Sequence, residues 1–342
     1  MAAVLDLRKQ QILQAVVEDY ISTAEPVGSR TLARKYRLGL SPATIRNEMA
    51  DLEEAGYLDQ PHTSAGRVPS DKGYRYYVDC LLEMQGLSPG ERQRIEEDLS
   101  SHREGAYLVQ TAARLMAELA PYAVLAVMPG LNRSRLRHLQ LLPLDGRHLL
   151  LVMVADPGVI DTRMLDLDAP LAWEERRRLV SLLNQGLAGS TLADLDRAIR
   201  DELRDELGPA LYDLVMDQLH DVLSGTDTGK VMVEGLVNLL RQPEFQNVQK
   251  LTTLLEMLGR QDEGLINLLR SRVRAGQIQV SIGRENAEEA IQSCALVTAG
   301  YEARGEVVGM LAVVGPTRME YGRVLGLVRE VAEELSRVFG EL

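Results

Sequence analysis

The stretch from Ser41 to Asp79, SPATIRNEMADLEEAGYLDQPHTSAGRVPSDKGYRYYVD, decides the fold of the N-terminal part of the chain. Its first third places Ile45, Met49 and Leu52 on one side of a helix, which predicts a buried stripe. Ser41 is a good N-cap, Pro42 suits the first helical position, and Gly56 suits the residue after a helix end. We expect a helix that begins after Ser41 and ends before Gly56.

The opposite side of this helix carries Ala43, Arg46, Asn47 and Ala50. The two alanines permit close approach to another surface. Arg and Asn are the side chains best suited to bidentate hydrogen bonding with guanine and adenine edges in the major groove of DNA. The pattern favours a DNA-reading face, with an ordinary solvated helix face as the alternative.

Two more helices are expected upstream of this one. Apolar residues at helical spacing predict the first over residues 8–23, and Ser29 is a candidate N-cap for a second over residues 30–36. Gly39 supplies the positive φ that a tight turn over residues 37–40 needs. Helix, helix, short turn and helix is the order of a helix-turn-helix domain.

Downstream, the sequence predicts a wing. Tyr57 and Leu58 begin a strand, a polar turn contains Pro61, Gly66 and Pro69, and Ser70 is expected to cap another helix. A wing places side chains against the sugar-phosphate backbone or in the minor groove, and four of its residues are suitable donors: His62, Thr63, Ser64 and Arg67. A plain surface hairpin is the alternative.

The segment Ser41 to Asp79 resembles the winged-helix signature of the HrcA family of bacterial heat-shock repressors. Two distant segments, Val231–Phe245 and Gly309–Val324, resemble the C-terminal blocks of that family. Pro42 stands where a small polar residue is expected, and it removes a backbone N–H that could bind phosphate. With the resemblance, the candidate DNA-binding residues are Arg30, Ser41, Ala43, Thr44, Arg46, Asn47, His62, Thr63, Ser64 and Arg67.

The resemblance implies a negative regulator of chaperone-operon transcription. It implies a homodimer that binds an inverted-repeat operator in double-stranded DNA, and a dependence on the GroE chaperonin as a partner. Under heat shock, unfolded proteins would occupy the chaperonin, and repression would fall. None of this follows from composition or spacing.

Charge is distributed unevenly along the chain. The net charge of −12 argues against a polyanionic partner for the molecule as a whole. Residues 28–47, however, contain five basic residues and no acid, whereas residues 48–59 contain five acids and no base. This separation is expected if one face of the first domain meets phosphate and the rest of the molecule does not.

The remainder predicts an α+β multidomain protein. We expect a winged helix-turn-helix DNA-binding domain (1–80), a linker helix (81–104), a GAF-like α/β sensor domain (105–130 and 228–342) and an inserted β-plus-helix dimerisation module (131–227). The module begins with a three-stranded meander over residues 135–167 and continues with helices to residue 223. The GAF-like fold and the insertion follow the family resemblance.

Dimerisation has a physical reason, because two winged helices read two half-sites of a palindrome. Candidate interface residues in the module are apolar, with packing inside the module as the alternative: Leu149, Leu151, Met153, Leu179, Leu182 and Leu183. Tyr74, Tyr76 and Tyr77 favour packing of the DNA-binding domain over stacking on bases.

Composition and motifs weigh against other classes of protein. The longest aliphatic run is too short for a membrane helix, and the N-terminus lacks a signal-peptide pattern, so we expect a cytoplasmic protein with no membrane partner. The sequence has no P-loop, GxGxxG, HExxH or GxSxG motif and no metal-spaced His/Cys set, so we expect no enzyme, no cofactor and no metal site.

Two other functions remain open. One is a metabolite-responsive winged-helix regulator with a small-molecule site in its GAF-like domain, which would need an apolar pocket with convergent polar groups. The other is a chaperonin-binding adaptor whose winged helix is vestigial.

Overall fold

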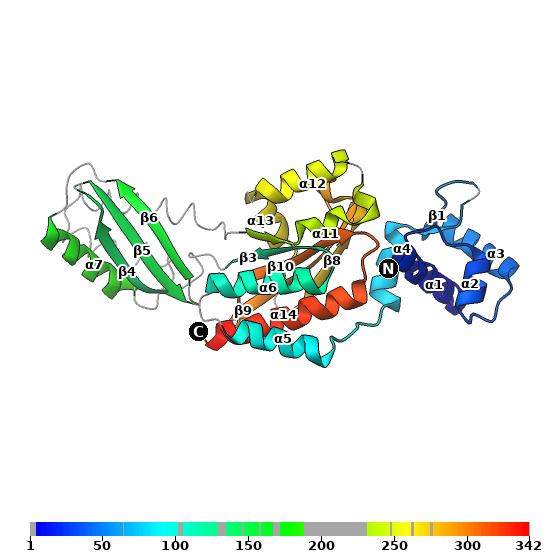
Figure 1. The fold of residues 1–342 in the computed structure, drawn as a ribbon, viewed down its shortest axis with the longest axis horizontal. Helices are drawn as coiled ribbons and strands as arrows, with labels where there is room; N and C mark the ends of the chain where they lie inside the picture. The colour runs from blue at the N-terminus through cyan, green and yellow to red at the C-terminus, as the bar shows by residue number, and fades with distance from the viewer. Residues whose placement is uncertain are drawn as a thin grey trace.

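The computed structural model describes residues 5–63, 65–101, 105–128, 135–145, 147–156, 159–166, 172–187, 231–246, 248–260, 263–273 and 276–341. Figure 1 shows three parts: a helical N-terminal domain, a central α/β domain and a β-meander module (residues 135–187). Together with the mixed sheet and helix content, this confirms the α+β class. None of the described helices is long and apolar enough to cross a membrane.

The N-terminal domain packs three helices against a two-stranded ribbon. The helices are α1 (Leu7–Thr23), α2 (Ser29–Lys35) and α3 (Pro42–Glu54). Strands β1 (Leu58–Asp59) and β2 (Val68–Pro69) pair antiparallel, and α4 (Asp71–Tyr76) follows, continued by a π-helical turn over Tyr77–Leu81. The predicted stripe of α3 is buried, together with apolar residues of the first two helices: Ile12, Leu13, Val16, Leu32, Ile45, Met49 and Leu52.

The start of α3 is as predicted. The Ser41 hydroxyl accepts a hydrogen bond from the Thr44 backbone N–H at 3.1 Å, and Pro42 occupies the first turn. Gly39 has a φ of +66°, as the turn before the helix requires. The Ser29 N-cap prediction is wrong: Gly28, in an extended conformation, is the N-cap of α2, and Ser29 lies buried in its first turn.

The central domain is built on one antiparallel sheet. Its spatial order is β7-β3-β10-β9-β8, formed by β7 (Val231–Glu234), β3 (Ala123–Val127), β10 (Glu306–Pro316), β9 (Cys294–Ala303) and β8 (Ile278–Ile282). Strands β3 and β7 pair directly, Leu125 opposite Val233, although they are far apart in the sequence. The β-meander module therefore leaves and rejoins the sheet between neighbouring strands.

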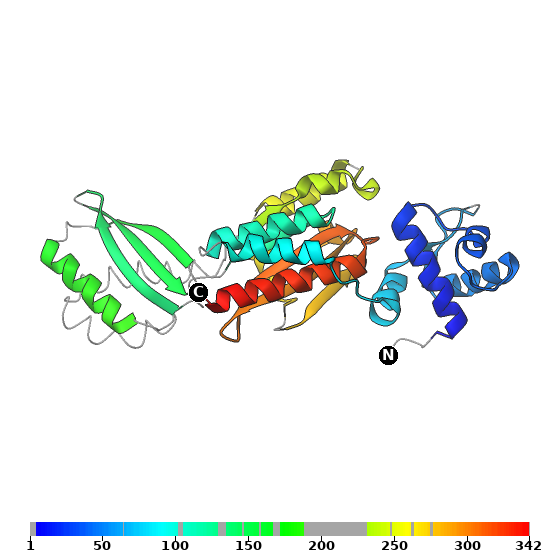
Figure 2. The ribbon, with the colours of Figure 1, turned by 60° about the horizontal axis from the view of Figure 1, so that its bottom comes forward.

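Helices cover both faces of this sheet. On one face lie α5 (Pro89–Ser100), α6 (Gly105–Leu119) and α14 (Tyr321–Glu341). On the other lie α11 (Leu236–Leu240), a 3-10 turn at Pro243–Phe245, α12 (Val248–Arg260) and α13 (Glu263–Arg270) (Figures 1 and 2). Alternate residues of β3 enter the two cores, Val124 and Ala126 on the first face and Leu125 and Val127 on the second.

Helix α5 differs from the expected linker helix. Ile95 and Leu99 are fully buried in the same core cluster as α14. The Glu91 carboxylate caps the start of α5 at the Ser88 N–H and also accepts from Arg323 of α14 at 2.7 Å. Among the described residues of the segment expected to link the domains, residues 82–88 form an irregular connector.

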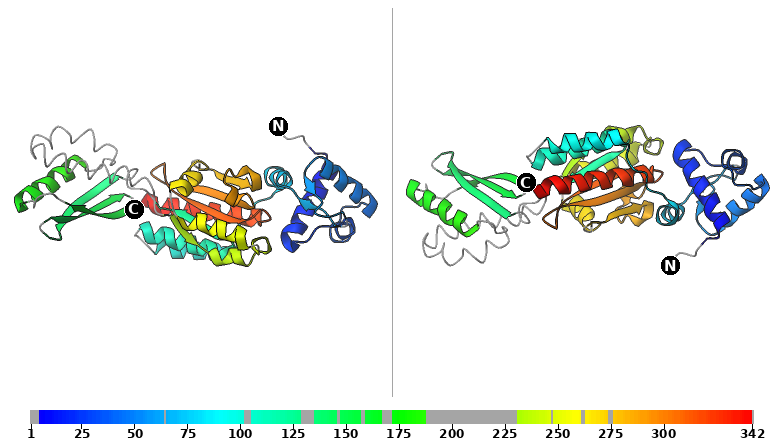
Figure 3. Two further views of the ribbon diagram at one scale, coloured as in Figure 1. Left: turned by 90° about the horizontal axis from the view of Figure 1, so that it is seen from above. Right: turned by 90° about the horizontal axis from the view of Figure 1, so that it is seen from below.

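The β-meander module contains β4 (Arg135–Pro143), β5 (His148–Asp156) and β6 (Val159–Asp166) in sequential antiparallel order, with α7 (Trp173–Leu187) against β4. Asn184 of α7 exchanges two hydrogen bonds of 2.7 Å with the backbone of Leu139. Figures 1 and 3 show this module and the N-terminal domain at opposite ends of the central domain. The helices expected after residue 187 lie outside the described residues.

The residues suggested as a dimer interface pack inside the module instead. Five of the six are buried within a single chain: Leu149, Leu151, Met153, Leu179 and Leu183. The sixth, Leu182, is partly exposed. An antiparallel sheet with one face against a helix buries every second residue, and Leu149, Leu151 and Met153 are the inward positions of β5, while Leu179 and Leu183 lie on α7. Similarly, Tyr74, Tyr76 and Tyr77 are buried, which favours packing over base stacking.

Candidate nucleic-acid interface

The outward face of α3 presents the residues that the sequence predicted. Ala43, Arg46, Asn47 and Ala50 are all exposed, whereas Ile45 and Met49 between them are buried. Because α3 is held from behind by its buried stripe, the Arg46 and Asn47 side chains share one rigid surface. The small alanines beside them leave room for the helix to approach another surface closely.

Two acidic residues of α3, Glu48 and Asp51, are paired with basic residues of α1. Lys9 of α1 lies 2.8 Å from Glu48 and 3.1 Å from Asp51, and Arg8 lies 3.3 Å from Glu48. The hydrogen bond with Glu48, followed by that with Asp51, raises the pKa of Lys9. Contacts with α1 therefore hold Glu48 and Asp51 away from the exposed Arg46, whereas Glu54 is exposed at the end of the helix.

Four arginines make a basic surface around α3, which we call the arginine surface: Arg30, Arg34, Arg37 and Arg46. All four are exposed, and none of them forms an ion pair with another described residue. Lys35, from the same basic run, instead pairs with Asp19 at 2.5 Å. The arginine surface has the donors that contact DNA phosphates.

Some predicted site residues have a structural task. The Ser41 hydroxyl caps α3 and lies 2.9 Å from the Thr44 hydroxyl, so these two side chains fix the start of the helix. His62 and Thr63 are exposed at the tip of the ribbon, and Ser64 lies outside the described residues. The ribbon turn is held by Gln60, whose side-chain amide donates to Thr63 O and Ala65 O, both at 3.1 Å.

The Arg67 side chain is mostly buried within the N-terminal domain. Its backbone exchanges hydrogen bonds of 2.8 and 2.9 Å with Val27, and its guanidinium lies 2.7 Å from Glu53. Only 18% of its side chain is exposed. The structure thus places Arg67 as a link between α3, the ribbon and the segment before α2.

Sequence reasoning left out two members of the arginine surface. Arg34 and Arg37 were counted in the basic run but not among the site residues. The signal that could have found them was the absence of any acid in residues 28–47. Val27 had no local signal, because its partner Arg67 is distant in the sequence. Gln60 acts within its own turn, where a polar side chain is no distinctive signal.

Outside this region, the described residues offer little for catalysis. No group of three His, Cys, Asp or Glu side chains among them is arranged to hold a metal ion. A cavity of about 470 Å³ lies between β8, β9 and α14, with Ile278, Leu325 and Arg329 in its wall. The small-molecule alternative would need a ligand in such a cavity, and it stays a prediction.

Comparison with known proteins places the chain in a family. Residues 106–325 match the model of the HrcA protein C terminal domain. A relative from Desulforudis audaxviator, named heat-inducible transcription repressor HrcA, is 44% identical over 99% of each chain. A relative of the same name from Desulforamulus reducens is 40% identical over 99% of this chain and 98% of its own. The chain belongs to the HrcA family.

The HrcA resemblance read from Ser41–Asp79 is thereby confirmed over the whole chain. A solved crystal structure of a hypothetical protein is similar over 98% of both chains, with a TM-score of 0.63 and 25% identity. The relatives of this HrcA chain span the N-terminal domain as well as the region of the family model, so the arginine surface lies within the shared length.

Proposed function

We propose that this protein is a transcription repressor whose N-terminal domain is a winged helix-turn-helix that reads operator DNA with α3. The main support for this proposal is the outward face of α3, where Arg46 and Asn47 are exposed beside Ala43 and Ala50. Three acids of the same helix, Glu48, Asp51 and Glu53, are paired with Lys9, Arg8 and Arg67. The name of the relatives, heat-inducible transcription repressor, supports the proposal.

The proposed contacts divide into two kinds. Arg46 and Asn47 read base edges in the major groove, while Arg30, Arg34 and Arg37 contact phosphates and fix the register of the helix. His62 and Thr63 at the ribbon tip contact the backbone beside the minor groove. Ser41 and Thr44 act mainly by holding the start of α3.

The rest of the proposal concerns assembly. The central domain is a GAF-like sensor, and residues 131–227 are an insertion in it that mediates homodimerisation. The support is the direct pairing of β3 with β7 on either side of that segment. A two-fold symmetric dimer presents two α3 helices, so its operator is an inverted repeat.

The regulatory part of the proposal follows family membership. The repressor acts on chaperone operons in the cytoplasm, and its binding-competent form depends on the GroE chaperonin. When unfolded proteins occupy the chaperonin, the repressor loses its partner and transcription rises.

A footprint of the purified full-length protein on chaperone-operon promoter DNA tests these statements, at one stated salt concentration, with and without chaperonin. We expect protection of an inverted repeat that strengthens when chaperonin is present. Absence of protection on every such promoter would refute operator binding. Protection that chaperonin leaves unchanged would remove the chaperonin dependence alone.

A further inference from the structure

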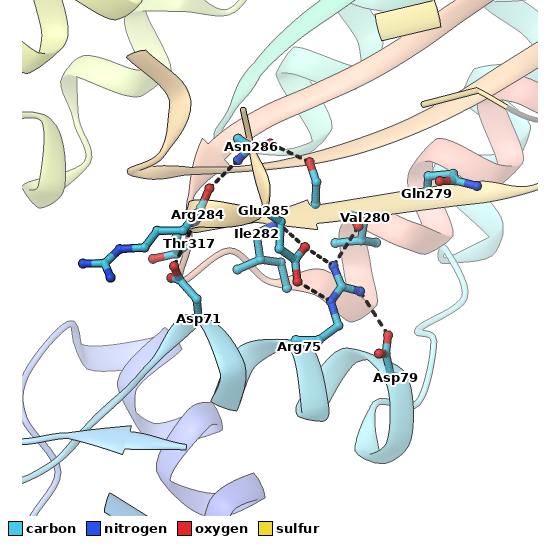
Figure 4. Close-up of polar contacts among 12 residues, drawn as sticks. Asp71, Arg75, Asp79, Gln279, Val280, Ile282, Arg284, Glu285, Asn286 and Thr317 are labelled. Atoms are coloured by element: carbon cyan, nitrogen blue, oxygen red, sulfur yellow. Dashed lines mark hydrogen bonds and ion pairs between the residues drawn. The ribbon is translucent and has the colours of Figure 1, made fainter. Parts of the chain in front are cut away.

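The N-terminal domain is attached to the central domain through Arg75 of α4. Its guanidinium donates two hydrogen bonds to the Glu285 carboxylate, at 2.8 and 2.6 Å, and one to the Val280 carbonyl at 2.7 Å (Figure 4). A further bond of 3.0 Å reaches Asp79 one turn along. A bidentate guanidinium–carboxylate pair fixes direction as well as distance, since both planar groups must align.

A second contact lies one turn before Arg75. The Asp71 carboxylate accepts a hydrogen bond of 2.9 Å from the backbone N–H of Arg284 (Figure 4). It packs on Gly283, where a Cβ would lie 2.2 Å from the carboxylate and where φ is +55°. Next to it, the buried rings of Tyr74 and Tyr321 lie with centroids 6.1 Å apart. The corner at residues 283–285 is thus shaped to receive α4.

Two other attachments hold the N-terminal domain from different directions. Arg318 donates to the Ile21 carbonyl in the last turn of α1 at 3.1 Å, while its guanidinium is paired with Glu244. In the connector, Gln85 N–H donates to the Gly322 carbonyl of α14 at 3.1 Å. A Cβ on Gly326 would lie 2.1 Å from the Gln85 carbonyl oxygen. The domain is therefore fixed at α1, at α4 and at the connector.

These attachments leave the reading face open. Helix α3 and the ribbon lie on the side of the N-terminal domain away from the central domain (Figure 1). The attachments do not cover Arg46 or Asn47. They therefore orient the N-terminal domain without blocking its reading face.

We propose that Arg75 is a positioning residue that sets the spacing of operator half-sites, because it holds α4, and with it α3, in one orientation relative to the central domain. This inference rests on the proposed function. In a dimer, the separation and direction of the two α3 helices follow from the rigid path through each central domain. The two helices then fit one half-site spacing, and the dimer binds operators with other spacings more weakly.

The test uses full-length protein and the inverted repeat mapped by footprinting. Affinity is measured for that operator, for a version with about half a helical turn, roughly 5 base pairs, inserted between the half-sites, and for a single half-site. We expect the wild type to prefer the natural spacing strongly. In Arg75→Ala the preference ratio falls about tenfold because the lost hydrogen bonds free α4, while single-half-site affinity is unchanged.

Arg284→Ala is the matched control. It removes the same charge from the same corner, but only the backbone N–H of Arg284 contacts Asp71 among the described residues. We expect it to keep the wild-type spacing preference. Arg75→Lys keeps the charge and loses the two-pronged geometry, so it should also lower the preference, and it serves if Arg75→Ala fails to fold.

The outcomes separate the inference from the proposed function. A wild-type preference retained in Arg75→Lys or Arg75→Ala would overturn the positioning role and leave repression intact. Affinity that rises at every spacing in those variants would also overturn it, because it would show an inhibitory contact. A wild-type protein that binds neither operator nor half-site would contradict the proposed function itself.

Discussion

At the scale of single residues, the arginines of the N-terminal domain differ in what surrounds them. Arg46 and Arg30 are exposed, whereas Arg67 is paired with Glu53 and its Nε is buried without a hydrogen-bond partner among the described residues. Charge type alone does not separate these roles. The surroundings of each guanidinium indicate whether it is available to DNA or holds the domain together.

Arg67→Ala should destabilise the N-terminal domain by about 1–3 kcal/mol, because Glu53 loses its partner inside the domain. Denaturant unfolding followed in this domain measures the loss. Arg30→Ala, on the exposed surface, should stay within about 0.5 kcal/mol of the wild type. Wild-type stability together with weaker binding to all DNA sequences in Arg67→Ala would instead make Arg67 a phosphate contact.

At the scale of elements, α14 organises the contacts between domains. One of its faces packs under β9 and β10, while Gly322 and Gly326 admit the connector backbone. Glycine costs helical stability, so two glycines in the first turns of a helix fit the close approach of another backbone.

Gly326→Ala tests this contact against Gly340→Ala in the same helix. A Cβ on Gly326 would lie 2.1 Å from the Gln85 carbonyl oxygen, whereas a Cβ on Gly340 meets nothing within 4 Å. We expect Gly326→Ala to lower the melting temperature and to speed amide exchange in residues 82–88. Gly340→Ala should be neutral or up to about 1 kcal/mol more stable. Equal effects of the two changes would show that the connector does not sit against α14.

The turn between β4 and β5 carries a pH-dependent contact. The hydrogen bond with Asp145, 2.7 Å from Nδ1, raises the pKa of His148, and Asp145 itself has its pKa lowered to about 2, chiefly by the Arg147 N–H. Because the folded pKa of His148 is the higher one, the stabilisation is complete below about pH 6.5 and is lost as pH rises through the raised value.

An NMR titration of His148 should give a pKa above 6.5, and Asp145→Asn should lower it. An equal pKa in the two proteins would contradict the contact. Asp166→Asn serves as a control. Asp166 lies 3.7 Å from His148 Nε2, farther than Asp145 lies from Nδ1, so its replacement should lower the pKa of His148 less than Asp145→Asn does.

Local patterns in the sequence predicted most elements. The bounds of α3 are as predicted, because an N-cap serine precedes its apolar stripe and a glycine follows its end. Local pattern did not predict that α5 packs on α14, or that Arg75 meets Glu285, because these contacts join residues distant in the chain. The role of Arg67 was missed for the same reason: its partners lie on α3 and before α2.

At the scale of the whole molecule, the basic residues proposed to bind DNA lie apart from most of the acidic charge. The chain carries a net charge of −12, yet the arginine surface lies at one end, away from the β-meander module (Figure 3). The acidic remainder would repel the DNA backbone, which fits the proposal that DNA binds at that end. The arrangement suits a protein that meets DNA only through its N-terminal domains.

The salt dependence of DNA binding should report the arginine surface. Replacing Arg34 or Arg37 with Ala should lower the slope of log affinity against log salt by about 1 each, because each phosphate contact releases counterions. Arg114→Ala removes the same charge from an exposed position on α6 and should leave the slope unchanged. A slope that all three variants share with the wild type would place the phosphate contacts elsewhere.

The most direct test of the account is a competition measurement at fixed salt between the mapped operator and scrambled DNA, for the wild type and for Arg46→Ala and Asn47→Ala. The wild type, supplied with chaperonin, should prefer the operator. Each substitution should reduce that preference by about 1–3 kcal/mol per lost base contact while the protein stays folded. A folded wild type that binds both DNAs equally, or variants that discriminate as well as it does, would contradict the assignment of α3 as the reading helix.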